Sequence, residues 1–152
     1  MIKRIDVSAW NDTIDWDTVA NYGMDFVIIR ITEIGNKIDK FFERNYKGCV
    51  DNKIPVGVYK YSYATNVSEI THEAETVVKV LKQRKLDYPV FLDLADNRQE
   101  NLSAELMMHM IDTFKAYLDK TNLSENSKFA YLFALRQFIE QYGSVTKKNL
   151  TA

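Results

Sequence analysis

Hydrophobic positions along the chain form four short runs that are separated by longer stretches with helical spacing. The runs cover residues 4–8, 25–31, 55–61 and 89–94. The second and fourth runs are almost continuously apolar, which is typical of strands in a parallel sheet that is covered on both faces. The pattern therefore predicts four buried strands.

The stretches between these runs repeat apolar residues every three or four positions, as one face of a helix does. Predicted helices cover residues 39–52, 68–84 and 103–120, and Asn66 and Ser103 are predicted N-cap residues. Short strands that alternate with helices predict βαβ units and an α/β fold with a parallel sheet. Such a sheet binds its ligand at the carboxyl ends of the strands.

The last part of the chain allows two interpretations. Residues 129–135 are seven consecutive apolar residues. Residues 129–133 form either a fifth strand or the first turns of a buried helix, and the pattern slightly favours the strand. No linker or low-complexity tract interrupts the sequence, so residues 1–152 are predicted to form a single domain.

Charge and composition exclude several classes of function. The net charge is −1, with 20 basic and 21 acidic residues, so neither nucleic acid nor an anionic membrane is an expected partner. His72 and His109 lack the spacing of metal ligands, and no cofactor or metal is expected. The single cysteine, Cys49, is interpreted as a small buried residue.

Three acidic residues lie where the predicted fold places a site. Asp6 lies in the first run, Asp93 near the end of the fourth, and Asp96 just beyond it. One interpretation is a buried polar network, because carboxylates in apolar strands need partners. The other is a carboxylate cluster for acid–base chemistry on a sugar bond. Trp10, just past a strand end, either stacks on a sugar ring or simply packs.

Several segments together resemble glycoside hydrolase family 25, the N-acetylmuramidases of phage endolysins, bacterial autolysins and some fungal lysozymes. The similarity follows the family order from residue 1 to about 120 and fades afterwards. The segments that carry it are residues 5–10, 14–16, 26–30, 39–46, 54–64 and 87–94.

The resemblance implies a TIM-barrel-like fold and hydrolysis of the β-1,4 bond between N-acetylmuramic acid and N-acetylglucosamine in peptidoglycan. It places Asp6 and Asp93 in the active site, and Ala95 where the family has its general-acid glutamate. Lys60 stands where the family often has histidine. The implied substrate-binding residues are Tyr59, Trp10, Tyr61, Asp96 and Arg30.

Ala95 predicts severely impaired hydrolysis, because a methyl group cannot protonate the leaving oxygen. Asp96 is a poor replacement: side chains alternate along a strand, so residue 96 turns toward Asp93 only if the strand ends by residue 95. One alternative is a non-catalytic module that binds cell-wall glycan. A weaker alternative is an unrelated, open α/β domain of flavodoxin-like size.

The family barrel has eight strands, and the segments expected near its end are not recognisable in this sequence. Either the chain is a truncated or rearranged relative, or two chains complete each other as a homodimer; the second hypothesis is motivated by the bare edges that an open sheet leaves. No signal peptide is recognisable, so the protein is expected to arise in the cytoplasm and to reach the cell wall by release or export.

Overall fold

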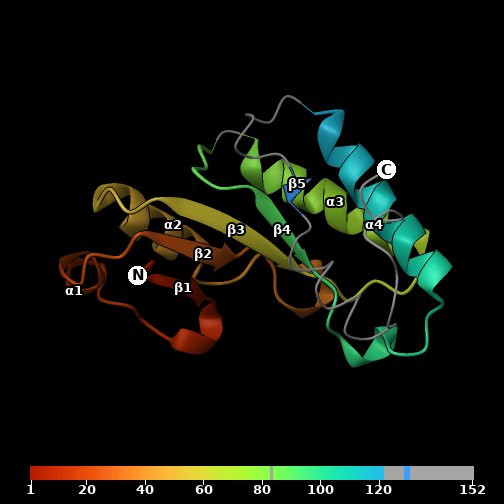
Figure 1. The fold of residues 1–152 in the computed structure, drawn as a ribbon, viewed down its shortest axis with the longest axis horizontal. Helices are drawn as coiled ribbons and strands as arrows, with labels where there is room; N and C mark the ends of the chain where they lie inside the picture. The colour runs from red at the N-terminus through yellow and green to blue at the C-terminus, as the bar shows by residue number, and fades with distance from the viewer. Residues whose placement is uncertain (83, 122–128, 131–152) are drawn as a thin grey trace.

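The computed structural model describes residues 1–82, 84–121 and 129–130, and these contain a parallel sheet of five strands (Figure 1). The strands lie side by side in chain order, β1-β2-β3-β4-β5, and each pairs in parallel with the next. Their bounds are β1 Arg4–Val7, β2 Phe26–Arg30, β3 Val56–Tyr61, β4 Val90–Asp93 and β5 Phe129–Ala130. This order excludes the flavodoxin-like alternative, in which the strands do not lie side by side in chain order.

The predicted elements are found, with one addition. The helices are α1 Trp16–Asn21, α2 Phe42–Asp51, α3 Val67–Leu81 and α4 Ala104–Asp119, with 3₁₀ turns η1 Ala9–Asn11, η2 Ile34–Asn36 and η3 Asn97–Gln99. Helix α1 was not predicted, since its six residues are too few for a clear apolar period. The predicted fifth strand is confirmed at Phe129–Ala130, and its predicted continuation over residues 131–133 lies outside the described residues.

Side chains cap the two long helices where the sequence predicts it. The Asn66 side chain accepts a hydrogen bond from the Glu69 amide (2.9 Å), and the Ser103 hydroxyl accepts one from the Leu106 amide (3.1 Å). In the described part of the chain, no helix is long and apolar enough to cross a membrane.

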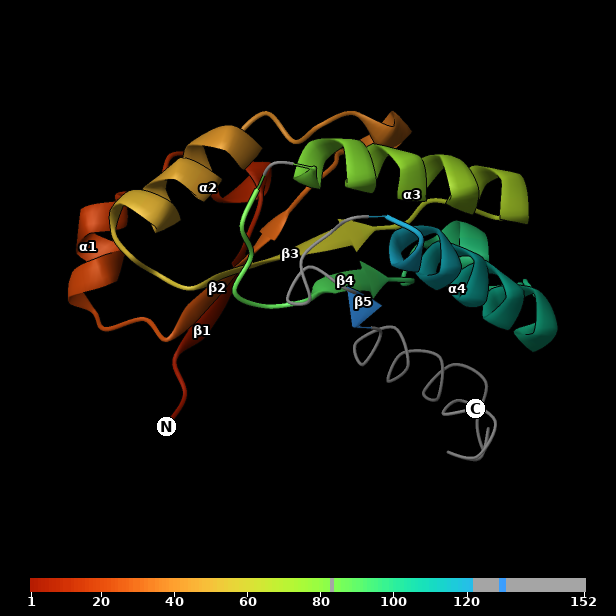
Figure 2. The same cartoon turned by 90° about the horizontal axis from the view of Figure 1, so that it is seen from above.

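The helices pack along one face of the sheet, and this face holds the core. Figure 2 shows α1, α2 and α3 above the strands, with α4 beside α3. Val27, Ile29, Val58 and Leu92 alternate along their strands toward the helices and are fully buried. Because successive side chains alternate, the intervening residues of each strand lie on the opposite face, which is where the acidic residues of β1 and β4 are found.

Candidate active site

Strand register brings Asp6 and Asp93 to the same face of the sheet. Asp6 pairs with Ile28, which pairs with Gly57, and Asp93 pairs with Tyr61. Gly57 and Tyr61 are four residues apart on β3, so all of these side-chain positions share one face. Tyr59 lies between them on that face.

Several charged side chains surround the phenol of Tyr59 and shift its pKa. Burial raises its pKa to about 12, the Arg30 guanidinium opposes this shift, and the carboxylates of Asp6, Asp93 and Asp39 add to it. Asp6, from the first strand, and Asp93, from the fourth, therefore act on a single tyrosine. The structure thus brings together residues that are 87 positions apart in the sequence.

Asp96 turns toward the same face because β4 ends early. The strand stops at Asp93, so the alternation of side chains does not extend to residues 95 and 96. Asp96 instead caps η3, where its Oδ1 accepts a hydrogen bond from the Arg98 amide (3.0 Å). Burial raises the pKa of Tyr61, and Asp96 and then Asp93 raise it further, so both carboxylates lie near this phenol. Ala95, which lies between Asp93 and Asp96 in the sequence, is exposed.

Arg30 is held in a buried ion pair at the end of β2. Its Nε and Nη2 lie 2.8 and 2.7 Å from Asp39 Oδ2. The same oxygen accepts a hydrogen bond from the Ala9 amide (3.0 Å), and Asp39 Oδ1 accepts one from the Phe41 amide (2.9 Å). The pair therefore connects β2 to η1 and to the start of α2. Arg30 was predicted to bind substrate, but two of its guanidinium nitrogens contact Asp39.

Trp10 follows Ala9 in η1 and is 87% exposed, so the packing interpretation of this residue is wrong. Its ring is free to contact a ligand from the carboxyl end of β1. Trp16, in contrast, is buried in the core.

A buried polar cluster, which we name the β3 clamp, lies behind the end of β3. It consists of Lys60, Ser62, Glu73 and Gln99, all buried. Lys60 Nζ donates to the Tyr61 carbonyl (2.9 Å) and lies 3.6 Å from Glu73 Oε1, which accepts the Tyr63 amide (2.9 Å).

Gln99 completes the β3 clamp from the other side. Its Nε2 donates to the Ala64 carbonyl (2.9 Å) and, at 3.3 Å, to the Ser62 carbonyl. The backbone from Tyr61 to Ala64 is therefore fixed by buried side chains from three separate elements. The rings of Tyr61 and Tyr63, with centroids 5.0 Å apart, are presented by this fixed segment.

Sequence reasoning missed the β3 clamp, although two signals pointed to it. Lys60 alternates with Tyr59 and Tyr61, so it faces the helices, where a charge needs a partner. Glu73 lies on the apolar stripe of α3, between Ile70 and Val77. Both residues are ionisable side chains at core positions.

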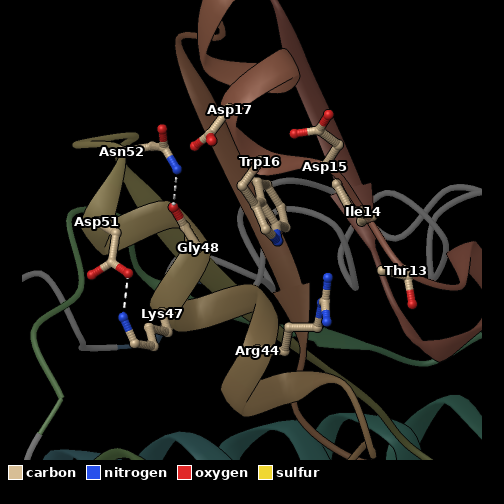
Figure 3. Close-up of a pocket in the computed structure, with 10 residues that line it drawn as sticks. All are labelled: Thr13, Ile14, Asp15, Trp16, Asp17, Arg44, Lys47, Gly48, Asp51 and Asn52. Atoms are coloured by element: carbon tan, nitrogen blue, oxygen red, sulfur yellow. Dashed lines mark hydrogen bonds and ion pairs between the residues drawn. The ribbon is translucent and has the colours of Figure 1, made fainter.

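A separate recess of about 520 Å³ lies between α1 and α2 (Figure 3). Its lining includes Trp16, Arg44, Lys47 and Gly48 but none of the predicted site residues. Trp16 packs so closely against Gly48 that a methyl group there would lie 2.1 Å from the indole Cδ1. This region serves the packing of α1 on α2, and the strand ends remain the candidate active site.

The described residues support neither a metal site nor a cysteine nucleophile. They contain no group of three histidine, cysteine or acidic side chains arranged to hold a metal ion. Cys49 is fully buried, as predicted, and burial raises the pKa of its thiol to about 12. A thiol in this state is not a nucleophile.

Comparison with known proteins connects this geometry to one family. The sequence profile described as glycosyl hydrolases family 25 matches residues 5–151. Lysozyme M1 of Streptomyces globisporus is 35% identical over 74 residues, which are 49% of this chain and 25% of that protein. YegX of Escherichia coli K12 is 27% identical over 125 residues, 79% of this chain and 44% of YegX.

A solved structure shows the same fold. The modular autolysin LytC from Streptococcus pneumoniae, in complex with a synthetic peptidoglycan ligand, superimposes with a TM-score of 0.72 at 27% identity. The match covers 83% of this chain and 31% of LytC. The predicted α/β fold is thus confirmed, and the chain spans less than half the length of each of these relatives.

Proposed function

Because the chain belongs to glycosyl hydrolase family 25, we propose that it binds the glycan strand of peptidoglycan at the carboxyl ends of its strands, and that Ala95 leaves it with little or no muramidase activity. One observation carries the proposal: Asp6 and Asp93 share a face of the sheet and both act on Tyr59. The synthetic peptidoglycan ligand in the LytC structure supports the choice of substrate.

Each residue of the site has a role in this proposal. Asp6 and Asp93 stabilise positive charge at the sugar carbon, as carboxylates do in oxocarbenium-like transition states. The half-buried rings of Tyr59 and Tyr61 and the exposed ring of Trp10 contact the apolar faces of the sugars.

The missing element is the proton donor. A general acid typically contributes about 10²–10⁴-fold to the rate, and alanine has no proton to give. Asp96 lies near Tyr61, but its Oδ1 already accepts the Arg98 amide and lies 3.7 Å from Arg98 Nε. Its carboxylate is held as the cap of η3, so Asp96 does not replace the acid. The chain then acts as a glycan-binding module that has kept the aromatic and acidic residues of the site and lost the proton donor.

Co-sedimentation with purified insoluble peptidoglycan tests the proposal. The chain is expected to sediment with the polymer without releasing soluble reducing ends. Tyr61→Ala should weaken binding by about tenfold, equivalent to about 1.4 kcal/mol of lost contact. Tyr22→Ala is the matched control, since Tyr22 is 69% exposed and lies at the end of α1. A chain that stays in the supernatant, or an equal loss in both variants, contradicts the proposal.

Self-association is a second, independent part of the proposal. In the described part of the chain β1 pairs with β2 alone, so its other edge offers unpaired backbone groups to a second copy. A homodimer formed there would extend the sheet. Light scattering that finds a strict monomer at high concentration contradicts this part and leaves glycan binding untouched.

A further inference from the structure

Arg98 lies on the exposed side of η3, and the β3 clamp fixes this turn in place. The neighbouring Gln99 is 1% exposed and donates to the carbonyls of Ser62 and Ala64. The turn is therefore anchored to the segment that follows β3. The position of Arg98 is set by a buried contact one residue away.

The guanidinium of Arg98 is stacked on an aromatic ring and is otherwise weakly engaged. Its Cζ lies 5.2 Å from the centroid of the Tyr63 ring, within the range of a cation–π contact. Its Nε lies 3.7 Å from Asp96 Oδ1, which is too long for a hydrogen bond. Among the described residues, the two terminal amino groups have no hydrogen-bond partner, and the side chain is 51% exposed.

The Arg98–Tyr63 pair adjoins the candidate active site. The ring of Tyr63 contacts that of Tyr61, and the carboxylates of Asp96 and Asp93 lie close enough to Tyr61 to raise its pKa beyond the effect of burial. A glycan strand whose sugar lies against Tyr61 would extend past Tyr63. The cation thus lies beside the expected path of the strand.

We propose that Arg98, held over Tyr63, binds a carboxylate that projects from the glycan strand. This inference rests on the proposed function. Muramic acid units carry carboxylates on their lactyl group or on the attached peptide, whereas N-acetylglucosamine is neutral. The planar guanidinium matches a carboxylate with two parallel hydrogen bonds, so the contact distinguishes muramic acid from its neutral neighbour.

Two carboxylates near Arg98 define how specific this contact must be. Asp96 is the first. The second is Glu69, whose pKa is lowered chiefly by the hydrogen bond from the Thr65 amide and to a smaller extent by the charge of Arg98. Both are engaged by backbone amides, those of Arg98 and Thr65 respectively. Because these carboxylates offset the charge of Arg98, we expect it to bind a carboxylate mainly through the geometry of its guanidinium. Added salt should therefore weaken this contact only partly.

The test measures equilibrium binding of three oligosaccharides by calorimetry at pH 7, using the chain with Ala95 so that no hydrolysis interferes. The probes are a tetrasaccharide of alternating N-acetylglucosamine and N-acetylmuramic acid with free lactyl groups, the same tetrasaccharide with peptide stems, and neutral chitotetraose. Arg98→Gln should weaken binding of at least one charged probe by about three- to tenfold and that of chitotetraose by less than twofold. The probe that responds identifies the source of the carboxylate.

Two further variants sharpen the result. Arg98→Lys keeps the charge but loses the planar fork, so its affinity for the charged probe should fall between those of the unaltered chain and Arg98→Gln. Arg84→Gln is the matched control: Arg84 also stacks on aromatic rings, Phe42 and Tyr46, and pairs with Glu43, and none of these residues belongs to the candidate active site. It should change no affinity.

The outcomes separate the two proposals. Equal losses on all three probes, or no loss on either charged probe, overturn the role of Arg98 while glycan binding stands. If the unaltered chain binds none of the three probes, the proposed function fails and this inference fails with it.

Discussion

The ends of β2 and β3 each carry a buried ion pair, and the two pairs are built differently. Arg30 contacts Asp39 at 2.7 and 2.8 Å, and both oxygens of Asp39 also accept backbone amides. Lys60 and Glu73 lie 3.6 Å apart, and within the described residues Glu73 Oε2 has no hydrogen-bond partner. Both carboxylate oxygens of Asp39 therefore accept hydrogen bonds, whereas, in the part of the chain that the structure describes, one oxygen of Glu73 does not.

The two pairs should respond differently to the loss of their acidic residues, Asp39 and Glu73. An arginine cannot lose its proton in a protein, so Arg30 without Asp39 remains a buried charge. A lysine can neutralise, and burial already lowers the pKa of Lys60. The arginine pair is therefore suited to rigid support of η1 and α2, and the lysine pair tolerates change more easily.

The largest effect is expected at Asp39. Asp39→Ala leaves the Arg30 charge unpaired and two backbone amides without acceptors, so the free energy of unfolding should fall by about 3–5 kcal/mol. Chemical denaturation measures it. A loss below 1 kcal/mol would show that the first pair is not the rigid support described above.

A smaller effect is expected at Glu73. Glu73→Gln keeps an oxygen that can accept the Tyr63 amide but removes the charge facing Lys60. We expect a loss of about 2–3 kcal/mol at pH 7, less than for Asp39→Ala because Lys60 can deprotonate. A loss equal to that of Asp39→Ala would contradict the claim that the lysine pair tolerates the loss of its acid more easily.

The pH dependence of these two losses sharpens the comparison. The pKa of Lys60 is lower in the folded chain than its usual 10.5, so between the two values the unfolded chain binds more protons and stability rises with pH. Glu73→Gln removes a charge that raises the pKa of Lys60, so it lowers the pKa of Lys60 in the folded chain further. The stability of this variant therefore begins to rise at a lower pH than that of the unaltered chain. The cost of Glu73→Gln should therefore shrink between pH 7 and 9.5, while that of Asp39→Ala stays constant. Denaturation at both pH values measures this, and parallel profiles would contradict it.

The smallest effect is expected at an exposed pair. Lys47 and Asp51 interact one turn apart on α2 with side chains 75% and 53% exposed. Lys47→Ala should change the free energy of unfolding by less than about 0.5 kcal/mol, because solvent screens exposed pairs. A loss above 1 kcal/mol would mean that burial is not what separates the pairs.

Patterns local to the chain predicted the fold well. The apolar runs gave the strands, and Asn66 and Ser103 cap helices as expected. Helix α1 was missed because it is short. The early end of β4, which turns Asp96 toward Tyr61, was left open because side-chain alternation alone does not reveal where a strand stops.

The site was predictable in part. Strand-end positions alone pointed to Asp6, Asp93 and Asp96, and the family resemblance added Tyr59. Strand register explains why Asp6, Asp93 and Tyr59 share one face of the sheet. The partners Asp39 and Glu73 were not identified, since they are 9 and 13 positions from Arg30 and Lys60 and meet them only after the chain folds. No local pattern singles out Arg98, because its position depends on the hydrogen bonds of Gln99 to the segment that follows β3.

The most direct measurement of the central claim compares this chain with Ala95→Glu on purified cell walls, following loss of turbidity and release of reducing ends. We expect little or no hydrolysis by the unaltered chain and a rate at least about 10²-fold higher once the acid is present. Robust and equal hydrolysis by both would contradict it, because the proton would then come from another group.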